Sequence, residues 1–212
     1  PSGKFTLGSP ATEVGRLADE GPQHLVTFPK AFYMGKYEVT QEQYQAVIGN
    51  NPSYFKGDPQ RPVEQISWKD ALAFCQEVGT RTKRAVRLPT EAEWEYACRA
   101  CTVSRFFSGD QDTDLNAVDW YRDSSVVGTH GVGKKLPNAW GLYDMHGNIS
   151  EYCQDWYGAY SQQAVSNPQG PAYGTLRVVR GGSWRGERQG RRSAIRLKIN
   201  SDNRDQNTIG FR

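Results

Sequence analysis

Arg180-Gly-Gly-Ser-Trp184 and Gly210-Phe211-Arg212 bracket a segment that reads RGERQGRRSAIRLKINSDNRDQNTI between them. From Arg177 onward there are ten Lys/Arg against three Asp/Glu, a net charge of +7. The other residues carry −4, because the whole chain carries +3. The segment is therefore a catalytic strand, a binding surface, or a set of arginines that pair with acids of the preceding part of the chain.

Composition is typical of a water-exposed globular domain. The chain has 212 residues, 37% hydrophobic and 23% charged, which is enough for one domain with a sizeable core. Its 22 glycines, 11 prolines and 12% aromatic residues indicate many turns held by aromatic clusters. No apolar run is long enough to span a bilayer. The chain starts at Pro1, so a removed leader and an extracytoplasmic or cell-surface location are one interpretation, and the compartment stays open.

Local patterns predict short elements in the first half of the chain. Residues 4–8 and 23–28 alternate apolar and polar side chains, the period of a half-buried strand, and residues 32–39 read as another strand. Capping-box patterns at Thr40, Ser67 and Thr90 predict three short helices that begin there. Residues 101–140 are irregular, and 141–158 and 176–184 read as aromatic strands around a polar turn. Helices early and irregular β structure later predict one compact α+β domain over residues 1–212.

Two patterns resemble metal sites without completing one. Cys98 and Cys101 form a C-x-x-C, but no second such pair is present, so we interpret them as free thiols. The stretch from Asp110 to Asp114 (DQDTD) lacks the glycine and distal glutamate of an EF-hand and reads as a solvated acidic turn.

Six stretches together resemble the formylglycine-generating enzyme, or sulfatase-modifying factor, superfamily. They occur in the order typical of that family and cover nearly the whole chain. The resemblance implies a C-type-lectin-like fold with short helices, small antiparallel sheets and often bound calcium. The stretches are 37–44 (YEVTQEQY), 62–68 (PVEQISW), 87–97 (RLPTEAEWEYA), 137–148 (PNAWGLYDMHGN), 180–184 (RGGSW) and 210–212 (GFR).

The resemblance also implies a calcium site around the turn that follows Asp144. Asp144 and Glu151 would supply carboxylates, and Gly147 and Ile149 would supply carbonyl oxygens, the ligand type that calcium prefers. The alternative is that both acids cap turns or pair with arginines.

Catalysis of the family's usual kind is not expected. The resemblance implies two catalytic cysteines shortly after the RGGS stretch, as thiolates that bind copper(I). Those positions fall near Gly186 and Arg191 here, and no cysteine follows Cys153. Oxidation of a partner's cysteine with copper is therefore not expected. The chain would be a pseudoenzyme, or an oxygen-dependent oxidoreductase acting on a protein or peptide-derived substrate without that pair, with Glu187 as one candidate base.

Our preferred interpretation is a ligand-binding domain. Non-catalytic members of the family occur in bacteria, including the variable proteins of diversity-generating retroelements, whose diversified surface is the segment from RGGSW to GFR. We expect a protein or peptide ligand. Nucleic acid is not favoured, because a pI near 8.7 with a near-neutral body is weakly basic. The predicted ligand-binding residues are Trp184, Arg185, Glu187, Gln189, Ile195, Leu197, Lys198, Ile199, Asp205, Gln206 and Thr208.

Overall fold

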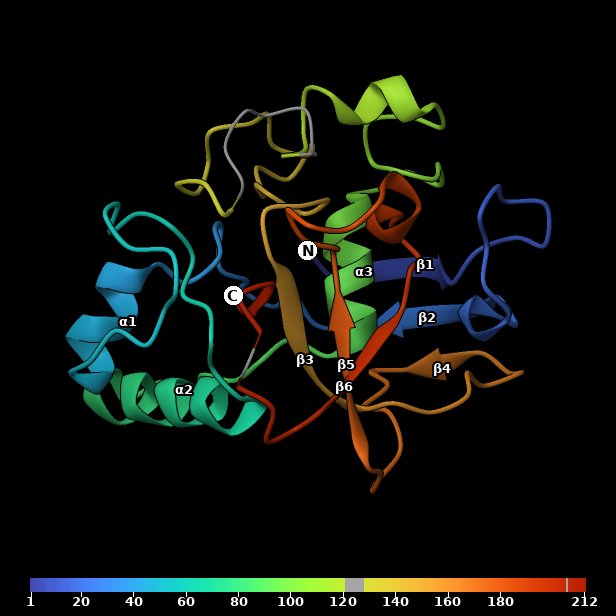
Figure 1. The fold of residues 1–212 in the computed structure, drawn as a ribbon. Helices are drawn as coiled ribbons and strands as arrows, with labels where there is room; N and C mark the ends of the chain where they lie inside the picture. The colour runs from blue at the N-terminus through green and yellow to red at the C-terminus, as the bar shows by residue number, and fades with distance from the viewer. Residues whose placement is uncertain (121–127, 205) are drawn as a thin grey trace.

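A computed structural model describes residues 1–120, 128–204 and 206–212. It is an α+β fold in which short helices and two small sheets are joined by long irregular connections (Figure 1). None of the described helices is both long and apolar enough to cross a bilayer. The α-helices are α1 (Gln41–Ile48), α2 (Trp68–Thr82) and α3 (Glu91–Arg99), and the 3-10 helices are η1 (Ala18–Glu20), η2 (Asp112–Leu115) and η3 (Arg188–Arg191).

The seven strands form two separate sheets. In the first, β1 pairs antiparallel with β2, and β2 pairs parallel with β4. In the second, the order is β6-β5-β3-β7; the first two pairings are antiparallel and β3–β7 is parallel. The strands are β1 (Gly3–Leu7), β2 (His24–Phe28), β3 (Ser150–Trp156), β4 (Val165–Ser166), β5 (Leu176–Arg180), β6 (Leu197–Asn200) and β7 (Ile209–Gly210).

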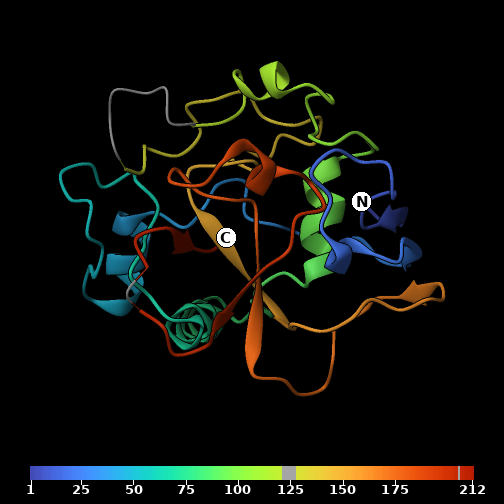
Figure 2. The same cartoon turned by 45° about the vertical axis from the view of Figure 1, so that its right-hand side comes forward.

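Helix α3 lies between the two sheets, as the two views show (Figures 1 and 2). All nine of its residues are buried. Trp94 and Cys98 pack with residues of β3 and β5, whereas Ala92 and Tyr96 pack with residues of β1 and β2. The helix is therefore the shared core of both sheets. Because every face is covered, its charged side chains need partners inside the protein.

The three predicted helix starts are confirmed, since the local capping signal is strong. The side chains of Thr40, Ser67 and Thr90 each accept a hydrogen bond from the backbone N–H of the residue three positions later. The side chain of that later residue in turn accepts from the backbone N–H of the cap residue. Such a reciprocal cap satisfies two backbone donors that the helix itself cannot. Helices α1 and α2 then pack side by side through the stacked rings of Tyr44 and Phe74, whose centroids lie 5.7 Å apart.

The predicted strand over 32–39 is wrong. The ring of Phe32 packs edge-on against Phe28, with centroids 5.5 Å apart, while Tyr37 packs on Tyr143 at 5.0 Å. Phe32 and Tyr37 thus make separate ring contacts, and the stretch forms no strand.

The predicted strands over 141–158 and 176–184 are correct only in part. Strand β3 begins at Ser150, because Asp144 and Asn148 before it have φ of 60° and 62° and form turns. Strand β5 ends at Arg180, where Gly181 and Gly182 adopt φ of 91° and 73°. Left-handed backbone at these positions cannot continue a β ladder.

Candidate functional site

Two arginines of the C-terminal segment (residues 180–212) are bound to the buried helix α3. Arg180, which is 0% exposed, forms ion pairs with Glu95 and, at 3.3 Å, with Glu91. It also donates to the carbonyl of Ala194 at 3.0 Å. Arg196 donates from Nε to Glu91 at 2.6 Å and from a terminal nitrogen at 2.8 Å. Glu91 and Glu95 of α3 are therefore neutralised from this segment, whereas Glu93 pairs with Arg87.

Three further arginines of the segment are buried and paired with acids from elsewhere. Arg192 contacts Glu20 and, at 2.7 Å, Glu13. The Nε of Arg191 lies 2.7 Å from Asp119. Arg212 pairs with Glu151. The excess positive charge of the segment is thus largely internal, and the expectation that its arginines pair with acids of the preceding chain is confirmed. The main argument for a nucleic-acid surface is removed with it.

A groove of about 640 Å³ lies along β6, the edge strand of the second sheet. Ser150, Val179 and Ile209 from β3, β5 and β7 line it, and Leu17 and Asp19 join them from the N-terminal part. The groove brings together five of the predicted ligand-binding residues, namely Leu197, Lys198, Ile199, Gln206 and Thr208. They are exposed or half-buried, which side chains that meet a ligand must be.

The groove combines apolar contact area with charge. Leu17 and Leu197 are 48% and 36% exposed. The ammonium of Lys198 lies 4.5 Å from the ring centroid of Tyr157, whose hydroxyl donates to Asp19. The second carboxylate oxygen of Asp19 is buried and has no hydrogen-bond partner in the described part of the chain. A ligand that offers both an apolar side chain and polar groups would match this lining.

The other predicted ligand-binding residues that the structure describes lie outside this groove. Arg185, Glu187 and Gln189 are exposed on the turn that contains η3. Trp184 is half-buried, and its indole N–H donates to the carbonyl of Asn207 at 2.9 Å. Asp205 lies outside the described residues.

Ile195 requires a correction. It is 4% exposed, and Ala194 beside it is 0% exposed, so this short stretch runs through the core. Its neighbours Arg192 and Arg196 are both held by buried acids. Because the chain is anchored on either side of it, Ile195 points inward and cannot be part of a surface.

An arginine fills the region where the family resemblance placed two cysteines. Arg191 is 0% exposed and donates to the carbonyl of Gly186 at 2.8 Å and to that of Ser183 at 2.5 Å. The two positions are therefore close together. What joins them is a guanidinium–carbonyl hydrogen bond, which has neither the nucleophile nor the soft metal ligand of a thiolate pair.

The cysteines that the chain does have are free, as predicted. Cys75, Cys98 and Cys153 are buried, and burial raises the pKa of the first to about 11 and of the second to about 12. Burial likewise raises the pKa of Cys153 well above the usual range. Thiols of this kind stay protonated at neutral pH and are poor nucleophiles. Cys101 is exposed.

The residues of the proposed calcium site fit the ion only in part. Asp144 is 2% exposed; Oδ2 accepts from the backbone N–H of Gly133 at 2.7 Å, and Oδ1 is buried without a partner in the described residues. Such an oxygen suits a cation. Both oxygens of Glu151, however, are taken by Arg212, and one also accepts from the indole of Trp94 at 2.7 Å.

The carbonyl of Gly147 accepts from the N–H of Ile149 at 2.8 Å, which closes the turn between them. The described residues contain no group of three or more His, Cys, Asp or Glu arranged to hold a metal. Calcium at this turn, resting on Asp144, stays a prediction.

Several groove residues were not predicted from the sequence. Leu17 and Asn203 line it from loops and Asp19 lines it from η1, and no local pattern distinguishes them. The stretch from Asp110 to Asp114, in contrast, behaves as expected for an acidic turn: Asp110 accepts from the N–H of Arg105 at 2.8 Å, and Asp112 pairs with its guanidinium at 2.6 Å.

The fold, the buried arginines and the six sequence stretches point to one family of proteins. A family model described as the sulfatase-modifying factor enzyme 1-like domain matches residues 1–212, and the chain belongs to this family.

Relatives in the family carry different names. The chain is 31% identical to the chaperone protein LppX of Paenibacillus barcinonensis over 72% of this chain and 69% of that protein. It is 31% identical to the serine/threonine-protein kinase pkn1 of Chlamydia pneumoniae, over 99% of this chain but 36% of the kinase. The formylglycine-generating enzyme of Bos taurus is 34% identical over 87% of this chain and 64% of the enzyme.

Two solved structures match almost the whole chain. Variable protein 1 of Treponema denticola superposes with a TM-score of 0.86 at 29% identity, covering 99% of this chain and 91% of that one. PvdO from Pseudomonas aeruginosa superposes with a TM-score of 0.88 at 28% identity, covering 100% and 90%.

Proposed function

We propose that this chain is a non-catalytic ligand-binding domain that holds a protein or peptide ligand in the groove along β6. The observation that carries the proposal is that the C-terminal segment contains two sets of side chains with different environments. The arginines at 180, 191, 192, 196 and 212 are buried in ion pairs, whereas Leu197, Lys198 and Gln206 face the groove. The former hold the segment in place, so the latter are free to serve recognition.

The chemistry around the groove supports binding over catalysis by thiolates. Arg191 occupies the region expected for the cysteine pair, and the buried thiols have raised pKa values. Glu187 is exposed on a turn outside the groove. An exposed carboxylate keeps its water shell and lacks the environment that makes a strong general base.

One of the structural relatives supports this interpretation. A variable protein shares the fold over nearly the full length of the chain. On such a scaffold, the exposed positions of the C-terminal segment, Arg185, Glu187 and Gln189 included, would form a surface whose side chains can differ without loss of the fold. We propose that this surface extends the groove.

A displayed library of random peptides, selected against the immobilised domain, tests the proposal. Selected peptides are expected to lose at least tenfold in affinity when Lys198→Ala and Gln206→Ala are combined. The matched control is Lys30→Ala with Gln45→Ala, two exposed residues of the same types far from the groove in sequence, and it is expected to bind like the wild type. The proposal would be contradicted if the selected peptides kept their affinity for the groove variant and lost affinity for the control variant.

An activity assay separates this proposal from its alternative. Oxygen consumption with a cysteine-containing peptide and copper(I) is expected to stay at the background rate. Turnover above background that is lost in Glu187→Gln would instead establish an oxygen-dependent oxidoreductase without the cysteine pair.

A further inference from the structure

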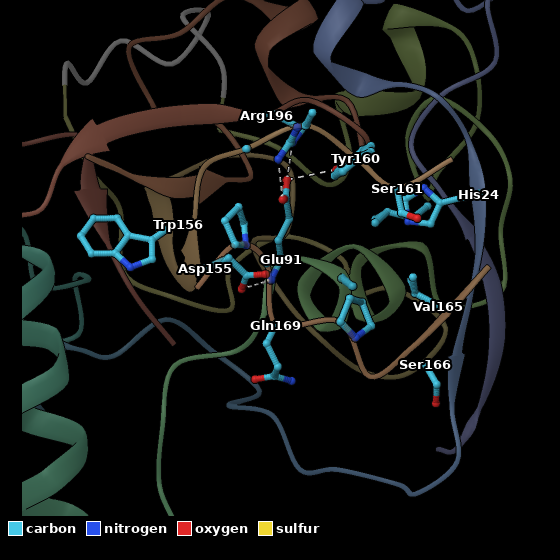
Figure 3. Close-up of a pocket in the computed structure, with 17 residues that line it drawn as sticks. His24, Glu91, Asp155, Trp156, Tyr160, Ser161, Val165, Ser166, Gln169 and Arg196 are labelled. Atoms are coloured by element: carbon cyan, nitrogen blue, oxygen red, sulfur yellow. Dashed lines mark hydrogen bonds and ion pairs between the residues drawn. The ribbon is translucent and has the colours of Figure 1, made fainter. Parts of the chain in front are cut away.

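A second cavity, of about 540 Å³, lies away from β6, between the start of α3, the end of β3 and the loop that carries β4 (Figure 3). Its volume is within the range of small-molecule sites, roughly 300–1,000 Å³. Among the described residues, only Arg196 lines both this cavity and the groove. None of the predicted ligand-binding residues that the structure describes lines it, so it is a separate feature of the domain.

Two buried acceptors face this cavity with unused capacity. Asp155 is 4% exposed; its Oδ2 accepts from the backbone N–H of Glu91 at 2.8 Å, and its Oδ1 accepts from no other residue in the described parts of the chain. His24 is 7% exposed, and its Nδ1 lies 3.1 Å from the carbonyl of Pro22. A carbonyl only accepts, so Nδ1 carries the proton and Nε2 of the neutral ring is an acceptor.

The charged donor that lines the cavity, Arg196, and the hydroxyl of Tyr160 are already committed. Arg196 donates from Nε and from one terminal nitrogen to the carboxylate of Glu91. Its other terminal nitrogen donates to the carbonyl of Asp19 at 2.9 Å. Tyr160 donates its hydroxyl to Glu91 at 3.1 Å. Figure 3 shows these three side chains joined on one side of the cavity. An anionic ligand would find no free charged donor here, whereas the carboxylate of Asp155 remains open to a cation.

The walls favour an apolar body on the ligand, because Leu7, Val165 and Pro171 line the cavity beside the aromatic rings. One face of each ring is already occupied by a cation: the guanidinium of Arg177 lies 3.3 Å from the centroid of Trp156, and that of Arg196 lies 3.9 Å from the centroid of Tyr160. The preference for a cationic ligand therefore rests on Asp155. A Cβ at Gly170, whose φ is +67°, would lie 2.9 Å from Oδ1 of Asp155. Glycine there leaves the carboxylate uncovered.

We propose that this cavity is a binding site for a small organic cation, an ammonium group on an apolar body. The ammonium would donate to Oδ1 of Asp155, and the apolar body would lie between the aromatic and aliphatic walls. A second donor on the ligand would reach Nε2 of His24.

Three probes with the same body test the charge preference, namely 2-phenylethylammonium, 2-phenylethanol and phenylacetate. Affinities measured by ligand-observed NMR at pH 8 are expected to be at least tenfold higher for the ammonium than for the alcohol, and lowest for the carboxylate. In Asp155→Asn, which keeps an acceptor for the N–H of Glu91, the ammonium is expected to bind no better than the alcohol. Asp202→Asn removes an exposed charge elsewhere and is expected to keep the full preference.

Variants at the rim of the cavity keep the proposal testable if Asp155→Asn fails to fold. Ser166 is exposed and lines the cavity. Ser166→Lys is expected to weaken ammonium binding severalfold, and Ser166→Glu to strengthen it. Equal affinity for the three probes, no binding of any of them, or an ammonium preference that survives in Asp155→Asn would overturn the proposal.

Discussion

The guanidinium of Arg212 lies against the carboxylate of Glu151, and the two side chains are 0% and 1% exposed. Nε donates to Oε2 at 2.7 Å, and a terminal nitrogen donates to Oε1 at 2.5 Å. The same Arg212 donates to the carbonyl of Tyr143 at 2.9 Å. This pair thus ties the last residue of the chain to β3 and to the turn before it.

Breaking this pair is expected to be costly. Arg212→Met leaves Glu151 charged and buried, and a buried pair broken on one side loses about 3–5 kcal/mol of unfolding free energy. Urea denaturation measures the loss. The double variant Arg212→Met with Glu151→Gln is expected to lose less than the sum of the single changes, because no lone charge remains. Additive losses would show that the two groups do not interact.

Calcium is expected to act through Asp144 and not through Glu151. A cation bound at the free Oδ1 would stabilise the folded state by mass action and raise the melting temperature. The response is expected to disappear in Asp144→Ala. Glu151→Gln is expected to lower the melting temperature in both conditions but to keep the calcium-dependent increase. A wild-type melting curve that is identical in calcium and in chelator would rule out this site.

The exposed turn around η3 is expected to tolerate change. Arg185→Ala, Glu187→Ala and Gln189→Ala together are expected to alter the unfolding free energy by less than about 0.5 kcal/mol, as exposed substitutions usually do. Arg180→Met is expected to cost several times more, roughly 3 kcal/mol or above, because Glu91 and Glu95 each lose one of their two arginine partners in the core. If the triple variant unfolds, the turn belongs to the core and cannot vary freely.

Asp155 is expected to make stability depend on pH. Burial first, and then the charge of Glu91, raise its pKa from the ordinary 3.8 to about 7. Between these values the folded state binds the proton more tightly than the unfolded state. The contribution of Asp155 to stability is therefore full below about pH 4 and is lost as the pH rises through 7.

The measurement is the difference in unfolding free energy between wild type and Asp155→Asn from pH 5 to pH 8. It is expected to shift steadily in favour of the variant as the pH rises. A constant difference would show that the carboxyl titrates normally. The other charged groups whose fields reach Asp155 are unchanged in the variant; they are Glu91, Glu93, Arg87 and Arg177.

Sequence reasoning succeeded where the signal was local. The caps at Thr40, Ser67 and Thr90 depend on side chains three residues apart, and all three helices begin there. It failed at 32–39, where Phe32 and Tyr37 pack on two separate aromatic partners and no strand forms. Aromatic residues are common in strands because they fit a half-buried surface, and a strand is only one way to bury them.

The site was harder to predict, because its geometry depends on long-range contacts. The predicted surface included Ile195, which stands among polar residues. The acids that bind Arg192 and Arg196 lie more than 100 residues away in sequence, and these ion pairs bury the stretch that contains Ile195. Asp19 and Leu17 reach the groove from the opposite end of the chain. No pattern within the C-terminal segment contains this information.

The buried arginines of the C-terminal segment have a practical consequence for protein engineering. Arg180, Arg192 and Arg196 hold the segment through acids on other elements, so the solvent-facing positions around them carry little of the fold's stability. A combinatorial library randomised at Arg185, Glu187, Gln189, Lys198 and Gln206 would then sample new recognition surfaces on an unchanged core. The domain would serve as a disulfide-free alternative to an antibody scaffold, because its four cysteines are free.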